Sequence, residues 1–186
     1  MELARIAAAD AVSEPIYKLA RQIKMASDCR DRDAICELRA VFDTVKEGDS
    51  RIKGFEKGLR YVNDPQTFDT FVRPTKMLEW CKDGACAEDC DSHAALVAAL
   101  CIALGFRAGV RAYGPDKNGP LTHVYAVALL PKMPMSDIDG SREKGVDVVG
   151  LDTTVSQSRV GWQPPPGRVV TAWILGQGIT IEGSRR

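Results

Sequence analysis

The sequence predicts an α+β fold in which helices come first and an antiparallel sheet follows. Helical periodicity dominates the first 80 residues, an apolar run without a polar face spans residues 94–104, and short β-branched or alternating runs fill the remainder. Helices followed by strands are typical of this class, whereas regular strand–helix alternation would indicate a parallel sheet. A length of 186 residues suits one domain. We expect a helical layer at 1–59, a core at 60–182 and a tail at 183–186.

Capping residues and apolar spacing place the helices. Ser13 before Glu14 and Pro15 suits a helix start, because Ser can cap and Pro is tolerated in the first turn. Gly48 and Gly105 suit helix ends. The helix around residues 94–104 is apolar on every face, which indicates burial within the protein. The expected helices are about 12 residues after Ser13, a second from residues 31–33 to Gly48, a short one within 51–69, one at 74–80, and the buried one.

The second half of the chain is read as strands. Its runs are short, rich in β-branched residues and separated by turn residues, as in an antiparallel sheet. Two long loops, at 131–145 and 155–167, are expected at the surface. The expected strands are 106–113, 122–130, 146–152, 168–175 and 179–182.

The charge balance and the apolar runs narrow the possible partners and the compartment. Lys plus Arg equal Asp plus Glu at 25 each, so no net charge favours nucleic acid or an anionic membrane surface. The longest apolar run is far below the roughly 20 residues that span a bilayer. Charged residues interrupt the N-terminus, which lacks the pattern of a secretory signal, so we expect a cytoplasmic protein whose six cysteines remain thiols. Cys29, Cys36 and Cys101 are expected to be structural.

Cys90 is the candidate nucleophile. It lies in the stretch from Glu88 to His93 that leads directly into the apolar helix. A thiol at a helix N-terminus lies among unpaired backbone N–H groups and at the positive end of the helix dipole. The sequence therefore predicts a favoured thiolate and raised reactivity.

A cysteine nucleophile needs a base and a group that orients the base. The chain has two histidines, His93 and His123. His93 lies on the same helix as Cys90, where the helix dictates the direction of its ring. His123 begins an expected strand that fixes its direction better, so we expect His123 to be the base and His93 to be structural or a neighbour of the cleft. Asp152, at the end of the next strand, is the expected orienting acid.

Together these motifs resemble the transglutaminase-like superfamily, in particular its bacterial and phage-encoded members. The resemblance covers about residues 60–154 and reproduces the order Cys, His, Asp. The segments that carry it are Arg60-Tyr61-Val62-Asn63-Asp64-Pro65, Pro74-Thr75-Lys76-Met77-Leu78, Asp89-Cys90-Asp91-Ser92-His93-Ala94, Ala103-Leu104-Gly105-Phe106-Arg107-Ala108, Thr122-His123-Val124 and Leu151-Asp152-Thr153-Thr154.

The resemblance implies a papain-like fold in which a cysteine heads a central helix packed on an antiparallel sheet. It implies acyl transfer from, or hydrolysis of, a protein or peptide amide by Cys90, His123 and Asp152, without a cofactor. Many relatives have Gly-Asp-Cys-Asp-Asp before the helix, whereas this chain has Glu88 in place of Gly and Ser92 in place of the second Asp. The 131–145 loop, which lengthens the His-to-Asp gap, is either a lid or a solvated excursion.

Two alternatives use the same region differently. Cys81, Cys86, Cys90 and His93 could bind zinc, although the spacing lacks the usual Cys-x-x-Cys pairs and leaves His123 unexplained. A papain-like domain could also serve binding or assembly, with Trp162 and the prolines at 164–166 as a contact surface. The sequence does not separate cross-linking, proteolysis and deamidation, and it gives no oligomeric state.

Overall fold

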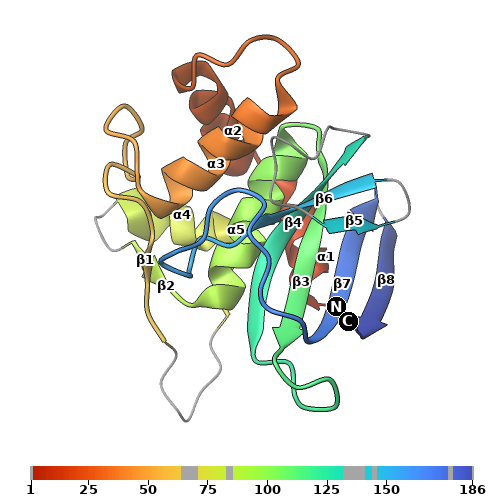
Figure 1. Ribbon diagram of the computed structural model, residues 1–186. Helices are drawn as coiled ribbons and strands as arrows, with labels where there is room; N and C mark the ends of the chain where they lie inside the picture. Colours follow the sequence, from red (N-terminus) through yellow and green to blue (C-terminus); the bar gives the residue numbers. More distant parts are fainter. Residues whose placement is uncertain are drawn as a thin grey trace.

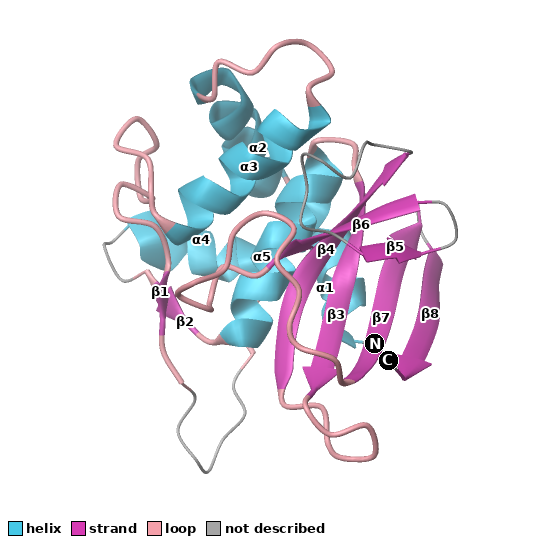
Figure 2. Ribbon diagram, viewed as in Figure 1, coloured by secondary structure: helices cyan, strands magenta, loops and turns pink. Residues whose placement is uncertain are grey.

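The computed structural model describes residues 2–63, 71–82, 86–131, 141–143, 146–175 and 178–185. Within these ranges the chain is mixed α+β, with helices on one side of an antiparallel sheet (Figures 1 and 2). None of the described helices is both long enough and apolar enough to cross a bilayer. The helices are α1 (Glu2–Ala11), α2 (Glu14–Ala26), α3 (Ala34–Lys46), α4 (Pro74–Lys82) and α5 (Cys90–Ala103).

The main sheet is antiparallel throughout its described part, in the order β5-β6-β4-β3-β7-β8. A separate parallel pair joins β1, which precedes α4, to β2, which ends just before Cys90. The strands are β1 (Arg60–Tyr61), β2 (Ala87–Glu88), β3 (Arg107–Gly114), β4 (His123–Pro131), β5 (Ser141–Glu143), β6 (Val146–Leu151), β7 (Arg168–Leu175) and β8 (Gly178–Arg185).

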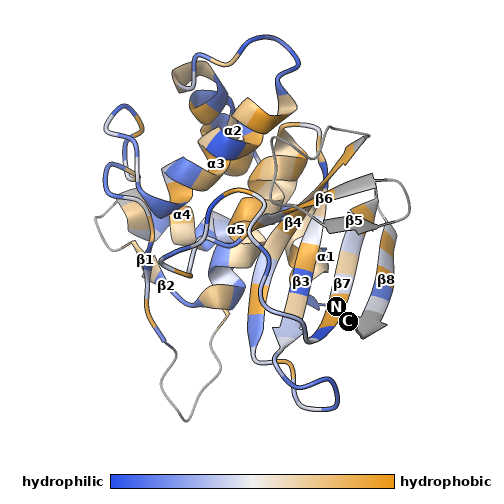
Figure 3. Ribbon diagram, in the orientation of Figure 1, coloured by the Kyte–Doolittle hydropathy of each residue, from blue (hydrophilic) through white to orange (hydrophobic). Residues whose placement is uncertain are grey.

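Helix α5 is the centre of the core. Every side chain from Ser92 to Cys101 is buried, and from Ala94 onward the helix is apolar on every face, as expected for a buried helix (Figure 3). It contacts strands β3 and β4 on one side and helices α1 to α4 on others. Gly105 ends the helix with φ +92°, a conformation that favours glycine. This burial fixes where the first residue of the helix, Cys90, stands relative to the sheet.

The sheet buries side chains on both faces. Residues at alternate positions along β4, such as Ala126 and Ala128, join the main core with α5. The intervening residues Tyr125 and Val127 belong to a second, smaller cluster with Val148 and Trp173. The opposite face of the sheet is therefore covered as well, by elements other than the helices.

Several expectations about elements need correction. Helix α1 was not expected. Its alanine-rich segment shows neither the pattern of a secretory signal nor a clear apolar stripe, yet several of its alanines are buried in the core. Residues 51–63 form turns and β1 in place of the expected short helix, and 64–69 lie outside the described residues. The expected tail at 183–186 is wrong up to Arg185, because β8 pairs with β7 to that residue. Strand β5 lies within the expected loop 131–145, of which 132–140 and 144–145 lie outside the described residues.

The expectation of six thiols is also wrong. Cys29 is bonded to Cys36, and Cys81 to Cys86, whereas Cys90 and Cys101 are free. Each pair is close in sequence, and the Cα atoms lie 5.7 and 4.5 Å apart, which is within the usual range for a disulfide. The expectation rested on compartment and not on geometry, which is why it missed both bonds. The cytoplasmic location itself stays a prediction.

Candidate active site

Cys90 is the first residue of α5, as expected. Asp89 caps the helix, with its Oδ1 accepting a hydrogen bond of 3.0 Å from the Ser92 backbone N–H. The thiol is free and half-buried. Its Sγ lies 3.6 Å from Oδ1 of the next residue, Asp91. The nucleophile candidate is thus placed by a well-capped, deeply packed helix.

The expectation of a favoured Cys90 thiolate does not agree with the site's electrostatics. Burial raises the pKa of Cys90 to about 12, and the carboxylates of Asp91 and Asp89 act in the same direction. A hydrogen bond with the Val124 backbone acts the other way and is outweighed. The sequence argument counted the helix terminus and left out the two neighbouring acids. At neutral pH this thiol is protonated in the resting protein.

His123 and Asp152 are brought together. His123 is the first residue of β4 and Asp152 follows the last residue of β6, the strand that pairs with β4. The distance between Nε2 of His123 and Oδ2 of Asp152 is 2.7 Å. Because an ionised carboxylate only accepts, Nε2 carries the proton, and Nδ1 is left as a hydrogen-bond acceptor.

Asp152 is fully buried, and local hydrogen bonds hold its carboxylate. Its Oδ1 accepts from the backbone N–H and the hydroxyl of Thr154, at 3.0 and 2.8 Å. Burial acts to raise the pKa of Asp152, but the bond and charge of His123 and the bonds of Thr154 outweigh it and hold the pKa below its ordinary value. The acid is therefore ionised at neutral pH and orients the imidazole.

Cys90 lies beside the start of β4 through its hydrogen bond with the Val124 backbone, one residue after His123. Across the described residues, no hydrogen bond joins the thiol to His123, and the side chain that the thiol contacts is that of Asp91. Catalytic hydrogen bonds are often long or misaligned without substrate. All three expected site residues thus meet at one end of the sheet, with the thiol turned toward an acid.

His93 is a buried structural histidine, as expected. It is 1% exposed, and its Nδ1 lies 2.9 Å from the hydroxyl of Thr153, the residue after Asp152. Burial lowers the pKa of His93 to about 4, with the Arg60 backbone and the Asp152 charge acting in the other direction. A neutral, enclosed imidazole of this kind links α5 to the end of β6.

The zinc alternative does not fit the observed bonding. Cys81 and Cys86, two of its four ligands, are joined in a disulfide, so neither offers a thiolate. Among the residues that the structure describes, no three His, Cys, Asp or Glu side chains gather as a metal site would require.

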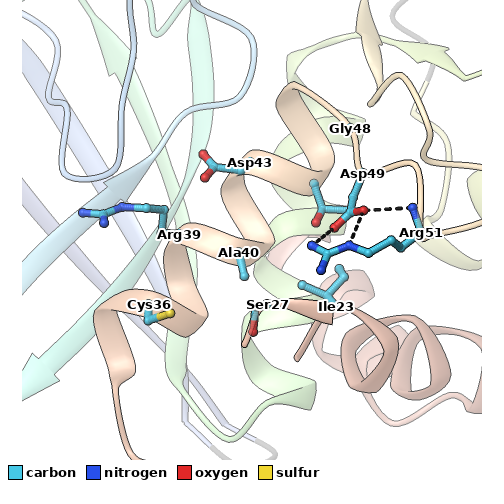
Figure 4. Close-up of a pocket in the computed structure, with 10 residues that line it drawn as sticks. Ile23, Ser27, Cys36, Arg39, Ala40, Asp43, Gly48, Asp49 and Arg51 are labelled. Carbon is cyan, nitrogen blue, oxygen red and sulfur yellow. Dashed lines mark hydrogen bonds and ion pairs between the residues drawn. The ribbon is translucent and has the colours of Figure 1, made fainter. Parts of the chain in front are cut away.

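A pocket of about 210 Å³ lies on the helical layer and shares no residue with the Cys90 site (Figure 4). Its charged side chains do not converge on a common point: Arg51 is paired with Asp49 at 2.7 Å, and Arg39 points away from that pair. Its cysteine, Cys36, is in a disulfide. We assign this pocket no chemistry.

No protein-family model, curated protein or solved structure matches the chain. The arrangement of Cys90, His123 and Asp152 and the motifs around them are what bears on function.

Some features of the site had no clear sequence signal. Asp91 follows the cysteine in sequence, which was visible, but its contact with Sγ depends on the side chain's direction. Lys46 and Gln163 lie on a helix and a loop that are remote in sequence from Cys90. Lys46 bonds to Ser158 in the loop after Asp152, and Gln163 bonds to Tyr125, near His123.

Proposed function

We propose that this protein is a transglutaminase-like thiol acyltransferase or hydrolase with a papain-like arrangement, acting on an amide of a protein or peptide. Cys90 is the nucleophile, His123 the general base and acid, and Asp152 the orienting carboxylate. The observation that carries the proposal is the 2.7 Å bond between His123 and the buried Asp152, beside a helix-heading cysteine. No cofactor enters the proposed reaction.

In the first half-reaction the Cys90 thiol attacks the carbonyl carbon of the amide. Because the thiol is protonated at rest, its proton moves to Nδ1 of His123 as the C–S bond forms. Asp152 stabilises the resulting imidazolium through Nε2. The backbone N–H of Cys90 is a candidate donor to the developing oxyanion. When the C–N bond breaks, His123 returns the proton to the leaving amine or ammonia, and a thioester remains.

In the second half-reaction, water or an amine attacks the thioester carbonyl. His123 accepts a proton from the attacking group and gives it to the departing Cys90 sulfur, which restores the thiol. Attack by water yields a carboxylic acid, and attack by an amine yields a new amide. Access to the thioester decides between hydrolysis and transfer.

The segment at residues 60–62 runs beside β2, the strand that leads to Cys90. Strand β1 pairs in parallel with β2, and the Val62 backbone N–H donates to the Glu88 carbonyl at 3.0 Å. Tyr61 is 40% exposed, and its ring makes an edge contact with His93. An aromatic surface next to the nucleophile suits an extended peptide better than a small polar substrate.

The proposal is tested with casein as glutamine donor and monodansylcadaverine as amine. We expect Cys90-dependent fluorescent labelling, or ammonia release without the amine, both abolished in Cys90→Ala. Asp152→Asn should lower the rate by roughly 10²- to 10⁴-fold through loss of imidazole orientation. Cys101→Ala, which changes a buried thiol remote from the helix start, is the matched control. Equal product formation by wild type and Cys90→Ala would contradict the proposal.

A non-catalytic binding module is the second candidate. The observation that favours it is the state of the thiol, which bonds to Asp91 and has a pKa of about 12. Turnover separates the two, because a resting thiol that is protonated reacts slowly with iodoacetamide under either candidate. A folded wild type without Cys90-dependent turnover on casein would support the binding module.

A further inference from the structure

The face of the sheet opposite α5 carries a row of polar side chains across three strands. Tyr125 on β4 is the register partner of Arg111 on β3, which in turn is the partner of Thr171 on β7. Their exposed fractions are 1%, 1% and 2%. The other buried side chains of this face are apolar. Burying the Arg111 guanidinium costs free energy unless its N–H groups are hydrogen-bonded. The acceptors of Arg111 therefore show which residue this row of side chains fixes in place.

The row holds Gln163, from the loop between β6 and β7. Arg111 donates from Nε to the Thr171 hydroxyl at 2.8 Å and from Nη1 to Oε1 of Gln163 at 3.2 Å. The Tyr125 hydroxyl donates to the same Oε1 at 2.9 Å. Two donors converging on one oxygen fix the orientation of the amide.

The loop with Trp162 and Gln163 packs against Gly150, where the missing side chain makes room for it. A Cβ at Gly150 would collide with the Trp162 carbonyl and come within 3.1 Å of Nε2 of Gln163. The Gly161 backbone N–H donates to the Gly150 carbonyl at 2.8 Å, which fastens the loop to β6. The position of Gln163, and through it that of the Tyr125 hydroxyl, is therefore set by the sheet.

Tyr125 is also the neighbour of the candidate base. It lies two residues from His123 on the same face of β4, and the two rings are nearly parallel, with centroids 6.0 Å apart and an angle of 20° between the planes. The bond from Nε2 to Asp152 fixes one point of the imidazole but permits rotation about that contact. A second contact against the ring is needed to fix the direction of Nδ1.

We infer that Tyr125, held by Gln163 and Arg111, is a positioning residue that keeps Nδ1 of His123 directed toward Cys90. The inference rests on the proposed role of His123 as base. The linked row makes the orientation of the base depend on a loop residue 40 positions away, by the difference between 163 and 123.

The test reads His123 directly, by long-range ¹H–¹⁵N NMR of the imidazole at neutral pH. The chain has two histidines, so the His93→Asn variant assigns the signals. In the wild type we expect one tautomer, protonated at Nε2. In Tyr125→Leu and Gln163→Leu we expect mixed tautomers, because an imidazole that is free to turn no longer keeps Nε2 on Asp152. In each variant the Cys90-dependent rate should fall by roughly tenfold.

Matched variants separate positioning from general disturbance. Gln157→Leu makes the same change at an exposed position of the same loop, and Tyr17→Leu removes a half-exposed ring from α2, and both should leave His123 unchanged. Gln163→Glu keeps an acceptor for Arg111 and Tyr125 and should retain the wild-type tautomer. Should Tyr125→Leu fail to fold, Gln163→Leu and Gln163→Glu decide the question.

An unchanged tautomer in folded Gln163→Leu would overturn the inference. A changed tautomer in a protein whose wild type turns over neither casein nor amine would leave the positioning role intact and overturn the proposed function. The two failures are thus distinguishable.

Discussion

The ammonium group of Lys46 donates a hydrogen bond of 2.6 Å to the carbonyl oxygen of Ser158. It also donates to the carbonyl oxygens of Val155 and Ser156 and to the Ser158 hydroxyl, at 3.0, 3.1 and 2.9 Å. The Ser158 hydroxyl donates in turn to the Asp152 carbonyl. The last residue of α3 therefore fastens the loop that follows the candidate acid.

Replacing Lys46 with Met should lower the free energy of unfolding by roughly 2 kcal/mol, because the three loop carbonyls lose the ammonium group that donates to them. Urea unfolding measures the change. Lys18→Met is the control, since the Lys18–Glu14 pair is 70% and 75% exposed and should contribute far less to stability than the Lys46 bonds. Equal effects of the two substitutions would show that Lys46 does not anchor the loop.

Asp91→Asn should increase the reactivity of Cys90. The change removes a negative charge and an acceptor that both raise the thiol's pKa, so more thiolate is present at neutral pH. We expect iodoacetamide to modify Cys90 roughly three- to tenfold faster at pH 7. Asp31→Asn, at an exposed position before α3, is the control and should not alter the rate. A slower reaction in Asp91→Asn would mean that the carboxylate helps to remove the proton.

His93 should make the fold sensitive to mild acid. Its pKa is lowered to about 4 in the folded state and is near 6.5 when unfolded, so the unfolded state binds the proton first as pH falls. The free energy of unfolding is unaffected by protonation of His93 above pH 6.5. It falls by about 3 kcal/mol as the pH decreases from 6.5 to 4. Urea unfolding at pH 7.5 and pH 4 should show a smaller difference in His93→Asn. An unchanged difference would assign the acid sensitivity to the carboxylates, Asp152 among them.

The oxidised protein should contain two titratable thiols. Six cysteines with two disulfides leave Cys90 and Cys101, which a thiol assay with Ellman's reagent detects after denaturation without reductant. Without denaturant we expect slow labelling of half-buried Cys90 and none of buried Cys101. Six thiols before reduction would contradict both bonds.

The parts of the fold that local pattern determines could be predicted from the sequence. Helix α5 was predictable because an entirely apolar helix has to be buried, and Gly105 ends it. Helix α3 was predicted from its apolar stripe, with a start near residues 31–33, and the structure identifies Asp33 as the cap, whose Oδ1 accepts from the Cys36 N–H at 3.0 Å. Ser13 precedes α2 as expected, but its hydroxyl donates to the Asp10 carbonyl and does not cap the helix.

Features that depend on tertiary contacts could not be predicted in this way. Helix α1 is buried through small alanine side chains that give a weak apolar pattern, and its Asp10 is 2% exposed because it binds Arg73 and Thr75. The raised pKa of Cys90 depends on burial and on the direction of Asp91, which spacing does not give. His123 and Asp152 were paired in advance because adjacent strands limit where their side chains can lie.

The position of Asp152 after β6 has a consequence for synthesis of the chain. Helix α5 is local in sequence, but the base gains its acid only after β6 has paired with β4, across a separation of 29 residues. Strands β7 and β8 join the far edge of the sheet through β3, and the loop holding Gln163 precedes them. A nascent chain that has emerged only as far as β4 therefore carries the Cys90 thiol and His123 without Asp152. Under the proposed mechanism, the site is completed late in translation, with the carboxyl-terminal third of the molecule.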